Sequence, residues 1–145
     1  MKLRLTSLSL PFILLLSACA SEQAVTAPSI NLEDLQTPRW SLTKIDNQEL
    51  DLASNQKAPS LSIDEALMAS GYSGCNNYFA ELNVKQNQIK LARMNSTMKL
   101  CLKDQMDLDN LVSAVLSDWS NVYIDRGVMV LSNAQHTLQF KAKRK

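Results

Sequence analysis

Apolar and polar residues alternate between Arg39 and Ile45, which places Trp40 and Leu42 on one face of a half-buried strand. Further short runs of strand-forming residues, separated by turn residues, predict seven more strands. These are Ser60–Ile63, Met68–Tyr72, Tyr78–Val84, Gln88–Leu91, Asn121–Ile124, Val128–Leu131 and Thr137–Phe140. Their shortness is typical of antiparallel elements joined by tight turns, such as Lys85-Gln86-Asn87.

The period changes between Asp104 and Trp119, where apolar residues recur at three and four positions. That spacing predicts an amphipathic helix, with Asp104 or Asp107 as its N-cap. The stripe consists of Leu108, Leu111, Val112, Val115, Leu116 and Trp119. Because one helix cannot cover both faces of an open sheet, we expect the strands to curl into a small antiparallel β-barrel or roll closed by the helix. The predicted fold class is therefore α+β and β-rich.

The first residues have the composition of an export leader. Lys2 and Arg4 precede an apolar stretch that is too short to span a bilayer, because a spanning helix needs about 20 apolar residues. The tetrapeptide Leu16-Ser17-Ala18-Cys19 resembles the bacterial lipobox, which implies that residues 1–18 are removed as a signal peptide and that Cys19 is lipidated. Several acyl chains on one cysteine would hold the protein stably at a membrane.

Ala20, which follows the lipidated cysteine, favours the outer membrane by the sorting pattern that this motif resembles, with retention in the inner membrane as the alternative. Residues 19–33 are then predicted to be a flexible tether, since the sequence from Ala20 to Ile30 is small, polar and without periodicity. Such a tether would hold the domain on the periplasmic side, on the order of 20 Å from the lipid.

Charge excludes one class of partner. Without residues 1–18 the chain has 15 − 2 = 13 basic residues against 14 acidic ones, a formal charge of −1. A nearly neutral protein has no field to follow a phosphate backbone, so nucleic acid is not expected as a partner. The basic end at Lys141–Lys145 is read as solvated, with contact to anionic lipid as the alternative. About 110 residues remain for one domain, which we expect to be monomeric.

Three segments resemble a known family. Arg39-Trp40-Ser41-Leu42 is followed by Gly74-Cys75-Asn76-Asn77-Tyr78-Phe79 and by Ser96-Thr97-Met98-Lys99-Leu100-Cys101. In this order they resemble the META domain, and within it the HslJ-like, heat-shock-associated bacterial lipoproteins, over residues 34–143. The resemblance implies a small lipocalin-like β-barrel with a packed helix, and a link to envelope stress. It implies no catalytic residues.

Cys75 and Cys101 are the cysteines that remain once Cys19 carries lipid. An even pair in an oxidising compartment predicts a disulfide, which would add roughly 3 to 4 kcal/mol by the loop-entropy estimate. The alternative is two buried thiols that do not meet. A nucleophilic role for Cys75 would need a neighbouring base, and His136 is predicted instead to be a structural turn residue.

The remaining polar residues suggest no reaction. The spacing of the cysteines and the histidine does not match a metal site, and no cofactor is expected. Asn76-Asn77 is read as a turn. Four acids are predicted to lie on a solvated surface: Glu65, Asp104, Asp107 and Asp109. Three methionines are predicted to fill gaps in the core: Met94, Met98 and Met106.

We therefore expect no enzyme, but an outer-membrane lipoprotein that is anchored by lipid and serves as an accessory or interaction module in envelope maintenance under stress. An envelope protein is the expected kind of protein partner. The alternative is a carrier for a small apolar ligand inside the barrel, and an enzyme using Cys75 ranks third. The size of the barrel interior distinguishes a carrier from an interaction module, since bulky side chains that point inward would leave no room for a ligand. The candidates are Trp40, Tyr78, Phe79, Trp119 and Phe140.

Overall fold

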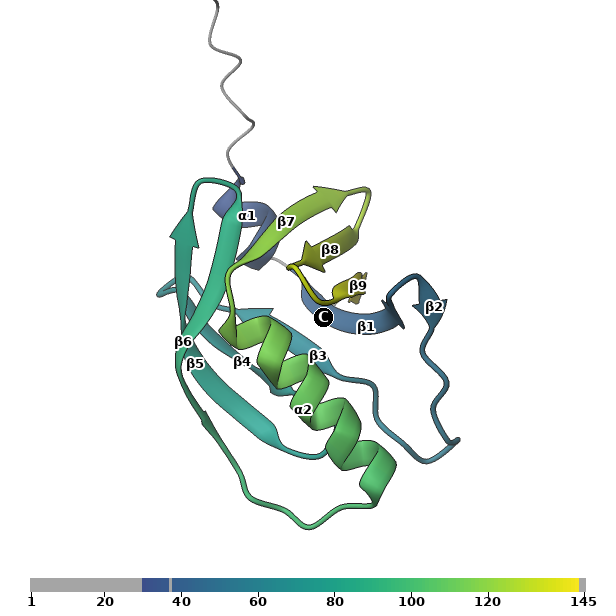
Figure 1. The fold of residues 1–145 in the computed structure, drawn as a ribbon. Helices are drawn as coiled ribbons and strands as arrows, with labels where there is room; N and C mark the ends of the chain where they lie inside the picture. The colour runs from purple at the N-terminus through teal and green to yellow at the C-terminus, as the bar shows by residue number, and fades with distance from the viewer. Residues whose placement is uncertain (1–29, 37, 144–145) are drawn as a thin grey trace, which may run out of the picture.

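A computed structural model describes residues 30–36 and 38–143. The predicted leader, Cys19 and most of the predicted tether lie outside this range. Two helices and nine strands occur in the described residues (Figure 1). In chain order they are α1 (Leu32–Gln36), β1 (Arg39–Ile45), β2 (Gln48–Glu49), β3 (Ser60–Ile63), β4 (Met68–Tyr72), β5 (Asn77–Lys85), β6 (Gln88–Ser96), α2 (Lys103–Ser117), β7 (Ser120–Asp125), β8 (Val128–Ser132) and β9 (Thr137–Lys143).

All strand pairs are antiparallel, and the order along the sheet is β2-β1-β3-β4-β5-β6-β7-β8-β9. An additional pairing of β1 with β9, from Arg39↔Lys143 to Ile45↔Leu138, closes the sheet into a ring. Closure removes the exposed edges that an open sheet would present. The predicted α+β, β-rich class is confirmed, with a ring-like sheet.

Two junctions of the ring have two paired positions each: β1–β3, and β6–β7, where Gln88↔Asn121 and Ile89↔Ser120 pair. Beyond these pairs the two strands diverge, and α2 packs against β6. Val112, Val115 and Leu116 are the buried residues of α2, which confirms the predicted apolar stripe. The helix therefore supplies the apolar cover that the short β6–β7 pairing leaves out.

Side chains fill the interior of the ring. Trp40 and Phe140 are 1% and 0% exposed, and the indole Nε1 of Trp40 donates a hydrogen bond of 3.0 Å to the carbonyl oxygen of Leu35 in α1. Tyr78 is also buried, and its hydroxyl donates to the carbonyl oxygen of Ser60 at 2.9 Å. This bond passes over Gly71, where a Cβ would lie 1.9 Å from the same oxygen. Strand β4 therefore needs a glycine at this position.

Several predicted boundaries move. Helix α1 begins at Leu32, inside the segment predicted to be tether, because Leu35 buries its side chain completely in the core. Strand β6 continues to Ser96 rather than ending at Leu91, because it pairs with β5 across an irregularity that accommodates Arg93 at φ 50°. Neither extension has an apolar alternation that could predict it.

The predicted N-cap of α2 is wrong. The helix begins at Lys103, and Leu102 occupies the N-cap position. The backbone N–H of Leu102 donates a hydrogen bond of 3.3 Å to the side-chain oxygen of Gln105, three residues into the helix, which is the half of a capping box that does not depend on the N-cap side chain. Asp104 lies in the first turn, where a carboxylate is favoured by the helix dipole, and the helix ends at Ser117, before Trp119.

Candidate functional site: a disulfide-braced loop

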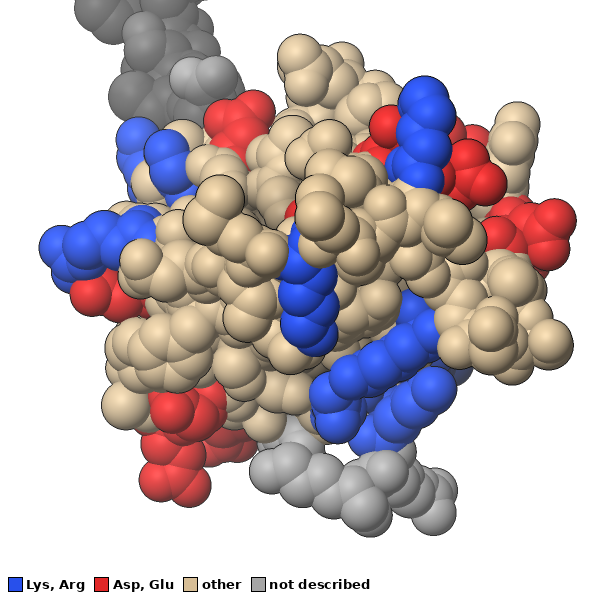
Figure 2. Space-filling model, turned by 90° about the horizontal axis from the view of Figure 1, so that it is seen from below, with Lys and Arg blue, Asp and Glu red and all other residues tan. Residues whose placement is uncertain are grey.

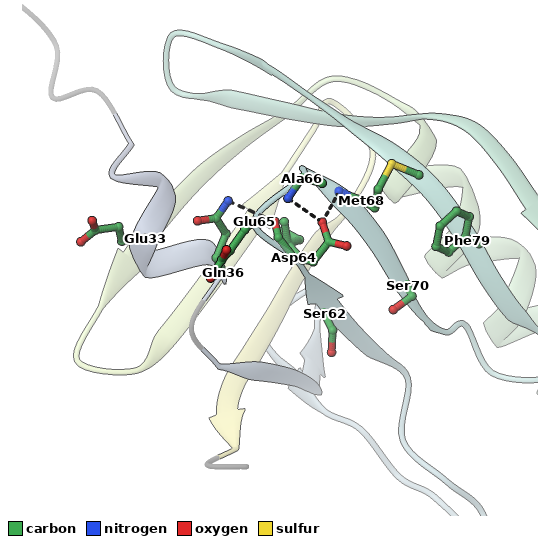
Figure 3. Close-up of a pocket in the computed structure, with 10 residues that line it drawn as sticks. Glu33, Gln36, Ser62, Asp64, Glu65, Ala66, Met68, Ser70 and Phe79 are labelled. Atoms are coloured by element: carbon green, nitrogen blue, oxygen red, sulfur yellow. Dashed lines mark hydrogen bonds between the residues drawn. The ribbon is translucent and has the colours of Figure 1, made fainter.

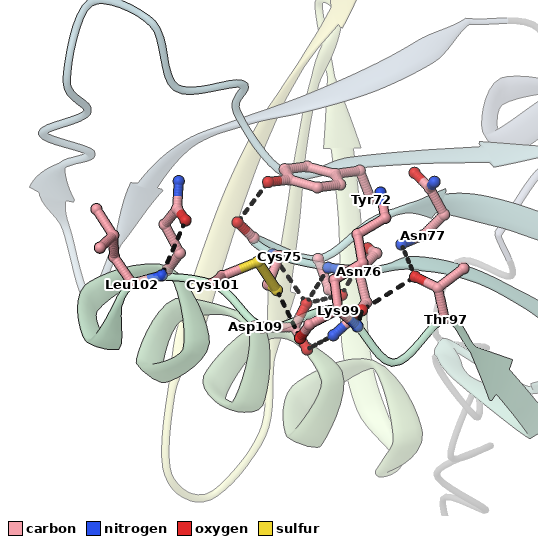
Figure 4. Close-up of a disulfide and its surroundings, with 12 residues drawn as sticks. Tyr72, Cys75, Asn76, Asn77, Thr97, Lys99, Cys101, Leu102 and Asp109 are labelled. Atoms are coloured by element: carbon pink, nitrogen blue, oxygen red, sulfur yellow. Dashed lines mark hydrogen bonds between the residues drawn. A yellow bond between two sulfur atoms is a disulfide. The ribbon is translucent and has the colours of Figure 1, made fainter.

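The segment Thr97–Leu102 connects β6 to α2 and carries the most specific part of the family resemblance. We call it the braced loop (Figure 4). A disulfide joins Cys101 in this loop to Cys75 in the β4–β5 turn, with 6.0 Å between their Cα atoms. That separation is ordinary for a disulfide. The predicted pairing of these two cysteines is therefore present in the structure.

Asn76 holds the other half of the braced loop. Its side-chain oxygen accepts hydrogen bonds from the Thr97 hydroxyl at 3.0 Å and from the Lys99 backbone N–H at 2.9 Å. The Thr97 backbone N–H also donates to the carbonyl oxygen of Asn77, at 3.0 Å. Asn76 of the β4–β5 turn and Asn77, the first residue of β5, thus fix both the start and the middle of the braced loop, while the disulfide fixes its end.

Asp109 in α2 ties the same turn to the helix. One carboxylate oxygen accepts from the Ser73 hydroxyl at 2.5 Å and from the backbone N–H groups of Cys75 and Asn76 at 3.0 and 2.8 Å. The other accepts from the Asn76 side-chain amide at 3.2 Å. Partial burial raises the pKa of Asp109, but the hydrogen bonds from Ser73, Asn76 and Cys75 outweigh it and hold the pKa below its ordinary value. Asp109 is therefore a structural anion in the folded protein.

Gly74 lets the turn approach the helix this closely. Its φ is +141°, and a Cβ there would lie 2.8 Å from the backbone nitrogen of Asp109. The Tyr72 hydroxyl donates to the Gly74 carbonyl oxygen at 2.5 Å, and the Lys57 ammonium lies 5.1 Å from the centre of the Tyr72 ring. Desolvation raises the pKa of Tyr72, with a smaller contribution from Asp109, so the phenol stays protonated as a donor.

On this rigid base the braced loop presents large apolar side chains to solvent. Met98, Leu100 and Leu102 are 98%, 97% and 75% exposed. Lys99 lies between the first two and Lys103 directly follows the third. The prediction that Met98 fills the core is wrong, because the bonds at Thr97 and Lys99 hold the loop away from the sheet. Met106 is also exposed, at 39%, whereas Met94 is partly buried against the core.

The braced loop lies at the lower end of the molecule in Figure 1, and α1 lies near the upper end. Seen from below, much of the surface is neither acidic nor basic; acidic side chains lie toward its edges, whereas one basic side chain crosses the middle and several others lie together to one side of it (Figure 2). Around the braced loop, Lys103 forms an ion pair with Asp107 at 2.5 Å. This ion pair balances the charge of Lys103 at the base of the loop, and Lys99 lies among the exposed apolar side chains of the loop itself.

A second surface feature is an open groove between α1 and β3–β5 (Figure 3). It has a volume of about 920 Å³, and Phe79, which is 52% exposed, lies at one end of it. Its acidic side chains are Glu33, Asp64 and Glu65, of which Asp64 uses one oxygen to cap the backbone N–H groups of Ala66 and Met68. This Asp64 oxygen therefore has a structural role in the β3–β4 turn. The groove lies on the outer surface of the sheet and not inside the ring.

Of the aromatic residues predicted to fill the interior, Trp40, Tyr78 and Phe140 do so. Phe79 points outward, because the alternation along β5 places it on the face opposite Tyr78, and Trp119 is half-buried just after α2. The packed interior does not favour a ligand inside the ring.

The remaining predicted residues are separated in space. His136 lies in the β8–β9 turn, as predicted, and its Nδ1 is 2.8 Å from the Asp46 carboxylate. That hydrogen bond, with one from the Thr137 backbone N–H, holds the pKa of Asp46 below its ordinary value. Glu65, Asp104 and Asp107 are exposed, as predicted. The prediction that Asp109 is simply solvated is wrong, because four donors converge on it.

The sequence did not predict two features of this site, which are the hydrogen bonds to Asp109 and the exposed apolar side chains of the braced loop. Asp109 is 33 residues from Asn76, and no local pattern connects a helical carboxylate to a distant turn. The exposure of Met98, Leu100 and Leu102 had one visible indication, which is that they alternate with polar or bonded residues in a segment outside the helical stripe.

Within the described residues, no group of three or more His, Cys, Asp or Glu side chains is arranged to hold a metal ion. Neither described helix is long and apolar enough to cross a membrane.

Comparison with known proteins identifies the family. The META domain model matches residues 33–145, and no curated protein matches the chain. One solved NMR structure is similar with 25% identity and a TM-score of 0.67, covering 78% of this chain and 95% of that one. A second, of a protein from Burkholderia xenovorans, has 19% identity and a TM-score of 0.63, covering 90% and 100%, and so supports the fold alone. Since the family model spans most of the chain, including the braced loop and the turn that holds it, the protein belongs to the META domain family.

Proposed function

We propose that this protein is a non-enzymatic lipoprotein of the outer membrane that acts through its surface, as an accessory or interaction module in envelope maintenance under stress. Lipid on Cys19 would anchor it on the periplasmic side. The proposal rests on the lipobox-like Leu16–Cys19, on the META domain, and on the kind of surface that the domain presents.

The observation that carries the proposal is the braced loop. Soluble proteins keep most large apolar side chains inside, and a contiguous exposed group of them marks a contact surface. Met98 and Leu100 are almost fully exposed on a loop that a disulfide and the Asn76 side chain hold in place. A surface ordered in advance loses less conformational entropy when it binds, so rigidity here supports contact with another body.

The arrangement supports an accessory role better than a reaction. Cys75, the candidate nucleophile, is 2% exposed and bonded to Cys101. Asp109, whose pKa lies below its ordinary value, is occupied by Ser73, Cys75 and Asn76. Perturbed groups at catalytic sites face a cleft, whereas these face each other.

The test is complementation of a gene deletion under envelope stress. The unsubstituted protein should restore growth, and Leu100→Asp should not, because it places a carboxylate at the centre of the braced loop. Tyr123→Asp is the matched control, since Tyr123 is 65% exposed in β7 near α1 and outside the braced loop. Full complementation by Leu100→Asp would contradict the proposed contact surface. Absence of acyl mass on the native protein would contradict the anchor.

A further inference from the structure

The size and shape of the apolar surface on the braced loop indicate what kind of partner it contacts. We propose that it inserts into a lipid bilayer, with Met98, Leu100 and Leu102 entering the acyl region and Lys99 remaining at the phosphate level. This deepens the proposed function, on which it rests, by naming the surface that the loop contacts.

The apolar area is too small for a stable protein interface. A fully exposed Leu or Met side chain offers roughly 100 Å² of apolar surface, so the three together offer about 300 Å². A stable protein interface buries about 800 Å² of total surface on each partner, of which more than half, on the order of 450 Å², is apolar. A bilayer needs no complementary shape, so three projecting side chains suffice for a shallow contact.

The shape of the loop suits insertion. Exposures of 98% and 97% mean that almost no protein atom covers Met98 or Leu100, so both side chains can enter lipid before the body of the domain meets the head groups. Leu102, 75% exposed, stands where α2 begins and marks the base of the inserted part. Hydrogen bonds of Thr97 and Lys99 to Asn76 keep the loop from folding back onto the sheet.

The charges around the loop permit this contact. Lys99 can extend its ammonium to lipid phosphates while its aliphatic stem lies beside the apolar side chains. Lys103 is paired with Asp107, and Asp104 is exposed on the first turn of α2. These four groups sum to zero, so insertion is driven by apolar burial and should change little with salt.

The tether is long enough to allow it. Cys19 and Ile30 are 30 − 19 = 11 positions apart in the sequence, which corresponds to at most about 38 Å of extended chain. Strand β5 has nine residues, a rise of about 30 Å, and runs from the end near the β5–β6 turn to the end that carries the braced loop. A lipid on Cys19 and the braced loop can therefore engage one bilayer together, with the domain standing on its loop.

The experiment places a tryptophan at each end of the mature protein, purified from membranes and reconstituted into vesicles of phosphatidylethanolamine and phosphatidylglycerol. Leu100→Trp probes the braced loop, Met98→Trp repeats the probe, and Tyr123→Trp probes the opposite end. Each is compared with the unsubstituted protein, whose own Trp40 and Trp119 give the background. Brominated lipids quench a tryptophan only when it lies in the bilayer.

We expect the fluorescence of the tryptophan introduced by Leu100→Trp or Met98→Trp to shift to shorter wavelength and to be quenched by brominated lipid, at low and at high salt. The fluorescence of the tryptophan introduced by Tyr123→Trp should show neither change. Quenching at Tyr123→Trp alone, at both ends, or at neither end overturns the inference. If neither end is quenched but Leu100→Asp still fails to complement the deletion, the loop meets a protein instead, and the proposed function stands without its lipid contact. Intact mass of the same preparation reports the acyl chains separately.

Discussion

Removal of the Asp109 carboxylate should destabilise the protein far more than removal of a neighbouring carboxylate on the same helix. In Asp109→Ala, the backbone N–H groups of Cys75 and Asn76 and the Ser73 hydroxyl lose their shared acceptor. Net hydrogen bonds contribute about 0.5 to 1.5 kcal/mol each, and more when one partner is charged. Because water reaches the half-buried carboxylate, we take the lower part of that range and expect a loss of about 2 to 3 kcal/mol.

The assay is thermal unfolding of the oxidised protein, with Asp107→Ala as the matched control. Both substitutions exchange Asp for Ala in α2, so the gain in helix propensity cancels. Asp107 is exposed and forms an ion pair with Lys103, and such surface pairs contribute about 0 to 1 kcal/mol. For a domain of this size, the loss at Asp109 lowers Tm by roughly 10 °C. Free energies of unfolding that agree within about 0.5 kcal/mol for the two variants would show that the hydrogen bonds to Asp109 do not stabilise the fold.

The pH dependence of the free energy of unfolding provides a second test of the stabilisation by the Asp109 carboxylate. Its pKa in the folded protein lies below that in the unfolded chain, so the folded state binds the proton less readily. The stabilisation is fully present above the unfolded pKa, which is about 3.9, and is lost as the pH falls through the folded pKa. The free energy of unfolding of the unsubstituted protein should therefore exceed that of Asp109→Ala by a constant amount at neutral pH. This difference should become smaller in acid.

Three further results are expected. Replacing both Cys75 and Cys101 by Ser should lower the free energy of unfolding by roughly 3 to 4 kcal/mol in denaturant titrations, because the closed loop no longer restricts the unfolded chain; no change would contradict the disulfide. Gly71→Ala should destabilise by about 3 kcal/mol or more in the same titrations, since its Cβ would lie 1.9 Å from a carbonyl oxygen of β3, and a loss below about 1 kcal/mol would show that β4 can shift. In NMR titrations, the pKa of the Asp46 carboxyl should be below its ordinary value and should rise toward it in His136→Ala, whereas an unchanged pKa would show that their hydrogen bond is absent.

How far the sequence predicted the fold depended on whether a pattern was local. The alternation around Trp40 and Leu42 set the bounds of β1, and β3 and β4 also match their predicted ranges. The polar end of β6, by contrast, is a strand only because β5 lies beside it, so no alternation revealed it. Helix α1 has five residues and one fully buried side chain, too few for a helical period.

The candidate site shows the same division. The cysteine pair was predictable because the leader-like start of the sequence favours export, and Cys75 and Cys101 form an even pair once Cys19 is set aside. The convergence of donors on Asp109 depends on the packing of α2 against a turn 33 residues away. The exposure of Met98 depends on bonds that lift the loop off the sheet. Composition alone favoured a core position for a methionine, and only tertiary contacts reverse that preference.

Both proposals require a braced loop that is rigid while its apolar side chains remain in solvent. Backbone ¹⁵N relaxation of residues 98–102, combined with a soluble paramagnetic probe, measures both properties at once. We expect order parameters close to the roughly 0.85 of rigid backbone, together with strong broadening of the Met98 and Leu100 methyl groups by the probe. Order parameters below about 0.6 would show a flexible loop, and methyl groups protected from the probe would show covered side chains; either result would contradict a rigid, exposed braced loop.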